Sequence, residues 1–484
     1  MDINFLIILT IIIPLAGVPL ILLSRNSPNL REFITILTAS ILFLTNLLLT
    51  INTLGLSESK TFVIVNFFPG GSIQLTPEPL GLIFGLIASG LWIVTSIYSI
   101  GYMRGKNEKN QTRFYCFFAL AIAATMGVAY AGNLITLFIF YEALSLSTYP
   151  LVTHHQSESA KQGGRTYLGV LLTTSVVFFL FGIIWIWSIT GTTEFVSGGI
   201  LENEINPYLT GILILLFIFG IGKAGVMPFH RWLPAAMVAP TPVSALLHAV
   251  AVVKAGVFSV LKITVYTFGV ENLSSNGASE FAMYLAAITI VAASIIALKQ
   301  NNIKKMLAYS TVSQLSYIVL AAMIVSSNSI IGSTLHIASH AFGKITLFFC
   351  AGAIYVASGK TEISQLKGIG KAMPLTMAAF LIGSLSIIGL PPTGGFISKW
   401  YILLGAIQQE EFIILLVLII STLLSVAYLL PVIYLSFFLT PDSKIDHGEA
   451  PTAILIALGI SVTLTILLFL YPTPIFQIAK FIGN

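Results

Sequence analysis

The chain has 484 residues, of which 56% are hydrophobic and only 8% are charged. Soluble domains carry about 25% charged residues, so this composition excludes a soluble fold and indicates an integral membrane protein. The formal net charge of +5 requires no nucleic-acid partner, because excess lysine and arginine first reflect how a membrane protein is oriented in the bilayer.

Apolar runs of the length that crosses a bilayer, about twenty residues, recur along the whole chain. They predict an all-α, multi-pass membrane protein with about fourteen transmembrane helices in a single membrane domain, residues 1–484. The first run lacks a basic leader and a cleavage site, so we expect it to be retained as a span. The predicted helices cover residues 4–23, 32–54, 78–102, 114–131, 133–152, 165–189, 207–238, 243–268, 280–298, 304–326, 331–357, 372–408, 412–438 and 451–471.

Lysine and arginine are distributed unevenly between the predicted loops. If the N-terminus lies outside, the outer loops hold only Lys60 and Lys480. Short loops rich in basic residues stay on the cytoplasmic side, so we expect the N-terminus and the C-terminus on the outer side of the plasma membrane. The cytoplasmic loops then hold Arg25, Arg31, Arg104, Lys106, Lys109, Arg113, Lys161, Arg165, Arg231, Lys299, Lys304, Lys305, Lys360, Lys367, Lys371 and Lys444.

Two predicted helices, the seventh and the twelfth, are too long for a straight crossing, and each contains a Gly-x-x-Pro sequence. The two sequences begin at Gly225 and Gly389. Proline breaks a helix, and a break inside the membrane persists only where it faces protein or a wet cavity. The breaks are five helices apart. Because five is odd, the two broken helices cross the membrane in opposite directions. We therefore expect two inverted five-helix repeats, about 114–268 and 280–438, with the transport path near the discontinuous helices.

Five lysines lie inside predicted spans, where a charge costs about 3 kcal/mol or more and implies a partner or a function. For any one of them, a structural ion pair is as good an explanation as transport. Lys262 lies near the outer end of its helix, so we expect its side chain to extend to the membrane surface. The five are Lys223, Lys254, Lys262, Lys344 and Lys399.

A glutamate and three histidines accompany these lysines. Glu142 lies near the middle of the fifth helix, and His248 shares the eighth helix with Lys254. His336 and His340 are spaced four apart and share one face of the eleventh helix with Lys344. A zinc site at the two histidines lacks a third ligand nearby, so no metal is expected. The remaining histidines, at helix ends or in loops, are expected to be solvated: His154, His155, His230 and His447.

Side chains of these types suit proton transfer. Removal from water lowers the pKa of a lysine by up to several units and makes its protonation reversible near neutral pH, while a neighbouring glutamate raises that pKa again. Histidine, with an unperturbed pKa of about 6.5, relays protons between such groups. A Glu–Lys pair whose separation changes can load and release a proton, so the row of buried groups predicts a proton path.

Several motifs surround the buried groups, and they are highly specific in combination. They are Phe140-Tyr141-Glu142, Gly222-Lys223-Ala224, Pro228-Phe229-His230-Arg231-Trp232-Leu233-Pro234, Ala239-Pro240-Thr241-Pro242-Val243-Ser244-Ala245-Leu246-Leu247-His248, His340-Ala341-Phe342-Gly343-Lys344 and Gly389-Leu390-Pro391-Pro392-Thr393-Gly394-Gly395-Phe396-Ile397-Ser398-Lys399. Over most of its length the chain resembles the antiporter-like subunits shared by Mrp-type cation/proton antiporters, respiratory complex I and membrane-bound hydrogenases. The resemblance implies fourteen helices with two inverted five-helix repeats, each containing one discontinuous helix.

The resemblance also implies roles for individual residues. The proton-translocating glutamate and lysines of the family fall on Glu142, Lys223, Lys254 and Lys399. The connecting residues, which form the proton relay, fall on His248, His336, His340 and Lys344. The implied path runs from the cytoplasmic side near Lys223 and Lys254, laterally through the histidines, to an outer exit near Lys399.

The predicted function is proton translocation in a Mrp-type monovalent cation/proton antiporter, as its D-type component, together with other membrane subunits and with sodium as the exchanged ion. The alternative is a proton-pumping subunit of a complex I-like NADH:quinone oxidoreductase, a membrane-bound hydrogenase or a formate-oxidising complex. A third possibility is a stand-alone solute carrier with a pocket at the broken helices. Buried lysines distributed through both halves of the protein suit a proton relay better than a pocket.

Redox chemistry by the chain itself is not expected. Its two cysteines, and the lack of a Gly-x-Gly-x-x-Gly turn after a strand, predict no cofactor and no catalytic site. The chain could still be a subunit of an oxidoreductase complex whose redox centres lie in other subunits.

Overall fold

The computed structural model describes residues 2–54, 60–68, 70–201, 206–441 and 446–482. Lys444, predicted in a cytoplasmic loop, lies outside the described residues. Within these ranges, twelve helical segments are long and apolar enough to cross a membrane. They are α1 (Ile3–Leu23), α2 (Pro28–Thr53), α3 (Pro79–Gly105), α4 (Gln111–Ala129), α5 (Leu134–Val152), Glu158–Thr190, Thr241–Phe268, α13 (Glu280–Leu298), α14 (Ile303–Ile324), α15 (Ser327–Ser358), α18 (Phe412–Phe438) and α19 (Thr452–Leu470).

Two of these crossings contain π-helical turns, in which the chain is wound more loosely than in an α-helix. The crossing Glu158–Thr190 consists of α6 (Glu158–Thr174), the π turn η1 (Ser175–Phe179) and α7 (Leu180–Thr190). The crossing Thr241–Phe268 consists of α10 (Thr241–Ala245), the π turn η4 (Leu246–Val250), α11 (Val252–Ile263) and the π turn η5 (Thr264–Phe268).

Two further crossings are discontinuous, as the sequence predicted for the seventh and twelfth helices. The first is α8 (Pro207–Gly220), followed by the 3₁₀ turn η2 (Gly222–Ala224), α9 (Trp232–Ala235) and the 3₁₀ turn η3 (Ala236–Val238). The second is α16 (Pro374–Ile388) followed by α17 (Gly394–Gln408). With the twelve continuous segments, these confirm the predicted fourteen helices.

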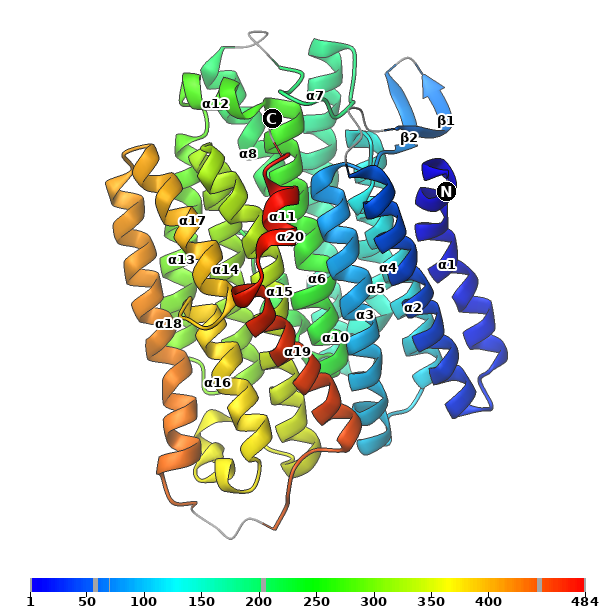
Figure 1. Cartoon of the computed structure of the whole chain (residues 1–484), viewed down its shortest axis with the longest axis vertical. Helices are drawn as coiled ribbons and strands as arrows, with labels where there is room; N and C mark the ends of the chain where they lie inside the picture. Colours follow the sequence, from blue (N-terminus) through cyan, green and yellow to red (C-terminus); the bar gives the residue numbers. More distant parts are fainter. Residues whose placement is uncertain (1, 55–59, 69, 202–205, 442–445, 483–484) are drawn as a thin grey trace.

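The two discontinuous crossings run in opposite directions. In Figure 1, α8 starts at the end of the bundle that carries α12 (Val270–Asn276) and the β-strands, whereas α16 starts at the other end. We call the first the hairpin end and the second the opposite end. The break is in the fourth of the five crossings in each predicted repeat, and both breaks contain a glycine at positive φ, Gly225 (71°) and Gly389 (92°). This left-handed conformation is readily adopted only by glycine.

The hairpin end carries a feature that the sequence did not predict. Residues Phe62–Phe68 (β1) and Gly71–Leu75 (β2) form an antiparallel two-stranded hairpin. Asn133, at the start of α5, holds it in place by donating from Nδ2 to the Ser72 carbonyl oxygen at 2.9 Å. The hairpin lies in the predicted connection between the second and third helices. Its strands are too short to be detected in a hydropathy window of about twenty residues.

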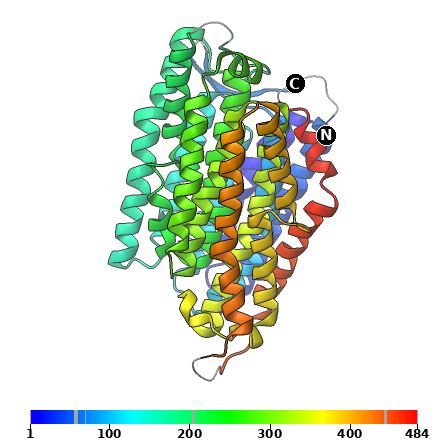
Figure 2. The same ribbon diagram turned by 90° about the vertical axis from the view of Figure 1, so that its left-hand side faces the viewer.

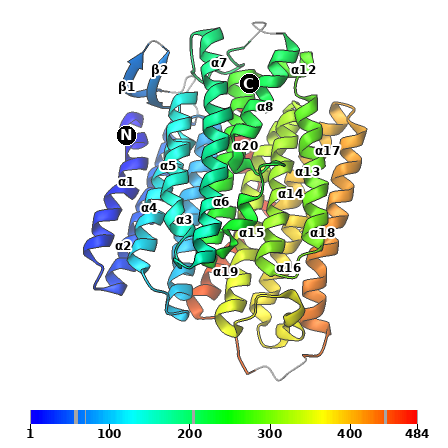
Figure 3. The same ribbon diagram turned by 180° about the vertical axis from the view of Figure 1, so that it is seen from behind.

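The crossings align along one axis (Figure 2), with α1 and α2 at one flank and α18 at the other (Figures 1 and 3). The crossing Thr241–Phe268 is 100% buried over its most apolar window, and α14 is 94% buried, whereas α1, α18 and α19 are only 33% buried. Central α15 packs against α10, α11, α14 and α17. The polar groups of this central layer are therefore enclosed by protein, and the outer helices present apolar side chains outwards. The remaining short elements are α20 (Thr473–Ala479), η6 (Ile363–Leu366) and η7 (Ile369–Lys371).

Candidate functional site: a buried row of lysines and histidines

The first link in the central layer joins α11 to α15. The amine of Lys254 hydrogen-bonds to Nδ1 of His340, and both side chains are buried. Lys254 belongs to the first predicted repeat and His340 to the second. The contact therefore connects the two halves of the chain at a pair of titratable groups.

From His340 the row continues along one face of α15 to α17. The imidazole rings of His340 and His336 stack with their centroids 6.0 Å apart, as their four-residue spacing predicts. Nδ1 of His336 then lies 2.9 Å from the Ser398 hydroxyl oxygen, which also lies 2.9 Å from that of Ser339. A hydroxyl both donates and accepts, so Ser398 can pass a proton on from His336.

The row ends at Lys399, next to Ser398 on α17. Its amine donates to the carbonyl oxygens of Ile387 at 2.9 Å and Ile388 at 3.1 Å, the carbonyls that the break after α16 leaves without a helical partner. The amine also lies 4.5 Å from the ring centroid of Tyr317. A cavity of about 290 Å³ adjoins Lys399 and Tyr317. The second break thus holds its lysine beside an open space.

Lys344 lies one helical turn beyond His340 and turns away from the row towards α14. Its amine donates to the Ser310 hydroxyl at 2.6 Å and to the Leu307 carbonyl at 3.3 Å. The Ser310 hydroxyl in turn lies 2.8 Å from that of Tyr428 on α18. Lys344 therefore begins a side branch of hydroxyls, and its predicted relay role stays a prediction.

Lys223 occupies the break after α8 and contacts α5. Its amine donates to the Tyr141 carbonyl at 2.7 Å and to the Ser145 hydroxyl at 2.6 Å, and it lies 3.1 Å from the centroid of the Tyr141 ring. Tyr141 and Ser145 share one face of α5, whereas Glu142 is turned about 100° around the helix. Glu142 and Lys223 therefore form no ion pair in the described part of the chain. Both buried carboxylate oxygens of Glu142 also lack a hydrogen-bond partner among the described residues.

His248 lies in the π turn η4, with its ring 4.8 Å from that of Phe348. Neither ring nitrogen has a hydrogen-bond partner among the described residues, and the same holds for the side-chain amide of buried Gln314. Buried polar atoms without protein partners are typical positions for internal water. π-Helical turns are also frequent at functional sites. His248 lies between Thr241 and Lys254 on the same crossing, and its predicted relay role stays a prediction.

The prediction that Lys262 extends to the membrane surface was wrong. Lys262 is fully buried and forms an ion pair with Glu78 at 2.8 Å, and its amine donates to the Ala131 carbonyl at 2.6 Å. The rings of Phe195 and Phe258 lie 4.8 and 5.6 Å from the amine. Glu78 precedes α3 in the chain, and the segment from the hairpin into α3 brings it over the end of α11, which no property of the eighth helix alone reveals.

A second correction concerns His154, which was expected to be solvated. It is only 3% exposed, and burial together with the nearby Arg113 guanidinium lowers the pKa of His154 to about 4. His154 follows the end of α5 and makes an edge-on contact with Phe114 on α4. It is therefore neutral at physiological pH and packs as part of the wall at the opposite end.

Sequence reasoning did not single out Tyr317, Ser310 or Tyr428, and it quoted Ser398 only as part of a motif. All four are buried. Tyr317, Ser310 and Ser398 contact predicted residues, and Tyr428 reaches Lys344 only through Ser310. A signal was present in the polar residues of α14, where Ser310, Gln314 and Tyr317 follow a helical spacing, but serine and tyrosine are common in membrane helices for packing alone.

Comparison with known proteins identifies the family. Residues 131–425 match the family described as NADH:quinone oxidoreductase/Mrp antiporter, TM. Subunit N of the NADH-quinone oxidoreductase of Desulforudis audaxviator is 33% identical over 456 residues, which cover 92% of this chain and 90% of that protein. A putative antiporter subunit, mnhA2, of Staphylococcus haemolyticus is 30% identical over 399 residues, 77% of this chain but only 49% of that protein.

Two solved structures share the fold. A chain of the archaeal membrane-bound sulfane sulfur reductase superposes with a TM-score of 0.86 at 24% identity, over 98% of this chain and 96% of that chain. A chain of the Mrp complex from Dietzia sp. DQ12-45-1b gives a TM-score of 0.86 at 18% identity, over 99% of this chain and 97% of that chain. The chain therefore belongs to the family of antiporter-like membrane subunits that NADH:quinone oxidoreductases and Mrp antiporters share.

Proposed function

We propose that this chain translocates protons as one subunit of a multisubunit membrane complex. The observation that supports this function best is the buried row Lys254, His340, His336, Ser398 and Lys399, which crosses from one predicted five-helix unit to the other. Each of these side chains can donate and accept a proton, or hold one reversibly. A pocket for a solute would instead gather its polar groups around one cavity.

In this proposal each of the two imidazole rings accepts a proton at one ring nitrogen and releases another from its second ring nitrogen. A proton passed from Lys254 to Nδ1 of His340 makes that ring cationic, and the ring then gives up its other proton from Nε2. The Nε2 atoms of His340 and His336 have no partner among the described residues, and the ring centroids are 6.0 Å apart. One bridging water is the natural link over such a distance.

In this proposal Glu142 and Lys223 couple the row to the rest of the complex. Lys223 rests on the Tyr141 carbonyl and the Ser145 hydroxyl, while the Glu142 carboxylate has no hydrogen-bond partner among the described residues. If the Lys223 amine leaves Tyr141 and Ser145 and moves towards the Glu142 carboxylate, two opposite charges come together. A nearby negative charge strengthens the binding of a proton by lysine. The separation of the pair then sets when Lys223 holds a proton and, through its charge, when Lys254 does.

Uptake and release are proposed at two cavities. One of about 210 Å³ lies at the opposite end between Tyr102, Thr241 and Lys304, and Thr241 begins the crossing that carries His248 and Lys254. The other adjoins Lys399. With the basic loops on the cytoplasmic side of a plasma membrane, uptake is cytoplasmic, release is on the outer side, and both termini lie outside.

The test uses the intact complex, purified from its native membrane and reconstituted in liposomes. Replacing Lys254 by methionine keeps the volume but removes the titrating group, so proton flux should fall by about a hundredfold or more. Lys161→Met, which alters an exposed lysine paired with exposed Glu158, serves as the matched control and should keep full flux. Wild-type flux from Lys254→Met at normal abundance and assembly would refute the proposal.

For the parent complex we propose a Mrp-type cation/proton antiporter, with this chain as its D-type component and sodium as the exchanged ion. The second candidate is a proton-pumping subunit of a complex I-like or hydrogenase-type redox complex. A specific observation favours the second candidate, since the subunit N relative is matched over 90% of its length and the mnhA2 relative over 49%. Mass spectrometry of the complex extracted in mild detergent separates the two. Membrane subunits alone support the antiporter, and flavin, iron–sulfur or nickel proteins support the redox complex.

A further inference from the structure

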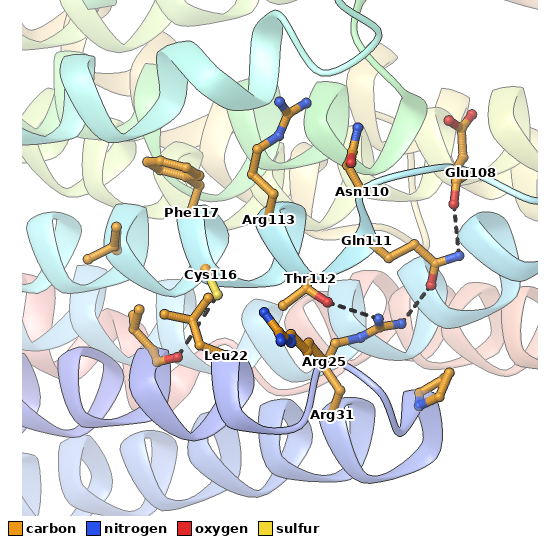
Figure 4. Close-up of a pocket in the computed structure, with 13 residues that line it drawn as sticks. Leu22, Arg25, Arg31, Glu108, Asn110, Gln111, Thr112, Arg113, Cys116 and Phe117 are labelled. Carbon is orange, nitrogen blue, oxygen red and sulfur yellow. Dashed lines mark hydrogen bonds between the residues drawn. The ribbon is translucent and has the colours of Figure 1, made fainter.

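A second feature, remote from the proton row, is a pocket of about 750 Å³ at the opposite end of α1, α2 and α4. Figure 4 shows three arginines on its lining, one from each of three places in the chain. Arg25 follows α1, Arg31 lies in the first turn of α2, and Arg113 lies in the first turn of α4. Three arginines thus line a single pocket, with the guanidinium group of Arg113 pointing away from those of Arg25 and Arg31.

The arginines are held in place but keep unused hydrogen-bonding capacity. Arg31 is 4% exposed and donates to the Gln111 side-chain oxygen at 2.7 Å and to the Thr112 hydroxyl at 3.2 Å. Arg113 donates to the His154 carbonyl at 2.7 Å. The Nε atoms of Arg31 and Arg113 are buried without a hydrogen-bond partner in the described part of the chain. A buried N–H group without an acceptor is energetically costly, so an acceptor bound nearby would stabilise it.

The charge of the lining is positive. Against the three arginines stands one acidic lining residue, Glu108, whose carboxylate lies 3.6 Å from Nδ1 of His155. Glu32, which lies 3.7 Å from Arg31, is engaged by Arg104. The acceptor that suits this site is therefore an anion, and guanidinium groups bind phosphate with paired, charge-assisted hydrogen bonds.

The other wall of the pocket is apolar and reaches into the membrane. Val18 and Leu22 on α1 face Phe117 and Leu120 on α4, one to two helical turns deeper than the arginines, at about 1.5 Å of rise per residue. A soluble anion needs no such wall. A phospholipid matches both parts, with its phosphate at the arginines and an acyl chain along the apolar side chains.

We propose that this pocket binds one anionic phospholipid. Basic pockets between transmembrane helices on the cytoplasmic side are suited to anionic head groups, and the excess of basic loops places this end on that side. The lipid would pin the α1–α2 pair to α4 through a ligand shared by all three helices. This inference does not depend on the proton path.

The experiment uses the delipidated intact complex and phosphatidylglycerol with a photoreactive acyl chain, read by peptide mass spectrometry and by native mass spectrometry. We expect cross-links at residues 18–22 or 117–120, and one bound phosphatidylglycerol per chain. Arg25→Gln, an exposed change that leaves the fold intact, should weaken binding by about tenfold, as loss of one charge-assisted contact does. Lys109→Gln, a change of an exposed lysine in the same region that does not line the pocket, should leave binding unchanged.

Four outcomes would overturn the proposal. The first is cross-linking only elsewhere on the chain, and the second is equal binding by wild type and Arg25→Gln. The third is competition by inorganic phosphate at millimolar concentration, which would make the pocket a site for a soluble anion. Equal retention of phosphatidylcholine would likewise remove the requirement for a negative charge.

Discussion

The five buried lysines differ in what their amines contact. Only Lys262 forms an ion pair with a carboxylate in the part of the chain that the structure describes. The other four donate to carbonyl oxygens, hydroxyls or an imidazole, as shown for Lys223, Lys254 and Lys399. A carboxylate holds a lysine in its charged form, whereas neutral acceptors allow it to give up its proton. The ion pair is the contact expected of a structural lysine, and the other four make the contacts that the proposed proton path requires.

We predict that breaking the buried pair destabilises the protein while removing both charges does not. Lys262→Met or Glu78→Gln alone leaves one buried charge unpaired, at a cost of about 3 to 5 kcal/mol. The double variant should recover most of that loss. The midpoint of thermal unfolding in detergent, followed by size-exclusion chromatography, measures this effect, and Lys161→Met at the exposed pair with Glu158 is the control. Additive losses in the double variant would show that the two residues act independently.

At the scale of elements, the breaks depend on close backbone packing. Gly256 on α11 lies directly against the backbone of Lys223 and Ala224, and a Cβ atom at this position would overlap both. The second break is equally tight, since a Cβ atom on Gly395 would overlap the Ser386 carbonyl. The backbone at each break, which carries or adjoins a buried lysine, is thus packed too closely to accept even an added methyl group.

Gly256→Ala should therefore displace the η2 turn and lower both stability and proton flux. The contacting atoms belong to the backbone and cannot rotate away, and overpacking of this kind costs about 1 to 3 kcal/mol. Gly169→Ala on α6, where no atom lies within 4 Å of the added group, is the matched control. The same unfolding and flux assays apply. Unchanged flux and stability in Gly256→Ala would show that the turn relaxes freely.

At the scale of the whole molecule, the polar row is enclosed and the loops at its two ends differ in charge. The central crossings are almost completely buried, and the flanking α1 and α18 are not. Enclosure keeps bulk water away from the row, so in the proposed function protons would pass only between the enclosed groups. The direction of movement then depends on which end of the bundle faces the cytoplasm.

The proposed orientation predicts opposite labelling of two serine positions. Ser274 in α12 is exposed at the hairpin end, and Ser159 in α6 is exposed at the opposite end. In intact cells a membrane-impermeant maleimide should label Ser274→Cys, whereas Ser159→Cys should react only after permeabilisation. The native Cys116 and Cys350 are buried, which keeps the background low. The reverse pattern would invert the orientation and exchange the sides of uptake and release.

Hydropathy and residue spacing by themselves determined the fourteen crossings, the two breaks and the ionisable residues that lie within the spans. Bilayer thickness sets helix length, and an ionisable residue inside an apolar run is conspicuous in one dimension. The shared face of His336, His340 and Lys344 also followed from spacing, because one helix fixes the relative directions of its own side chains.

Only the tertiary structure decided which groups meet. Lys262 pairs with Glu78, Lys223 turns to Tyr141 and Ser145 rather than to Glu142, and Ser398 completes the row. These contacts depend on how each helix is rotated and packed against others distant in the chain. The sequence of a single helix determines its length and its faces, but its neighbours determine what each face touches.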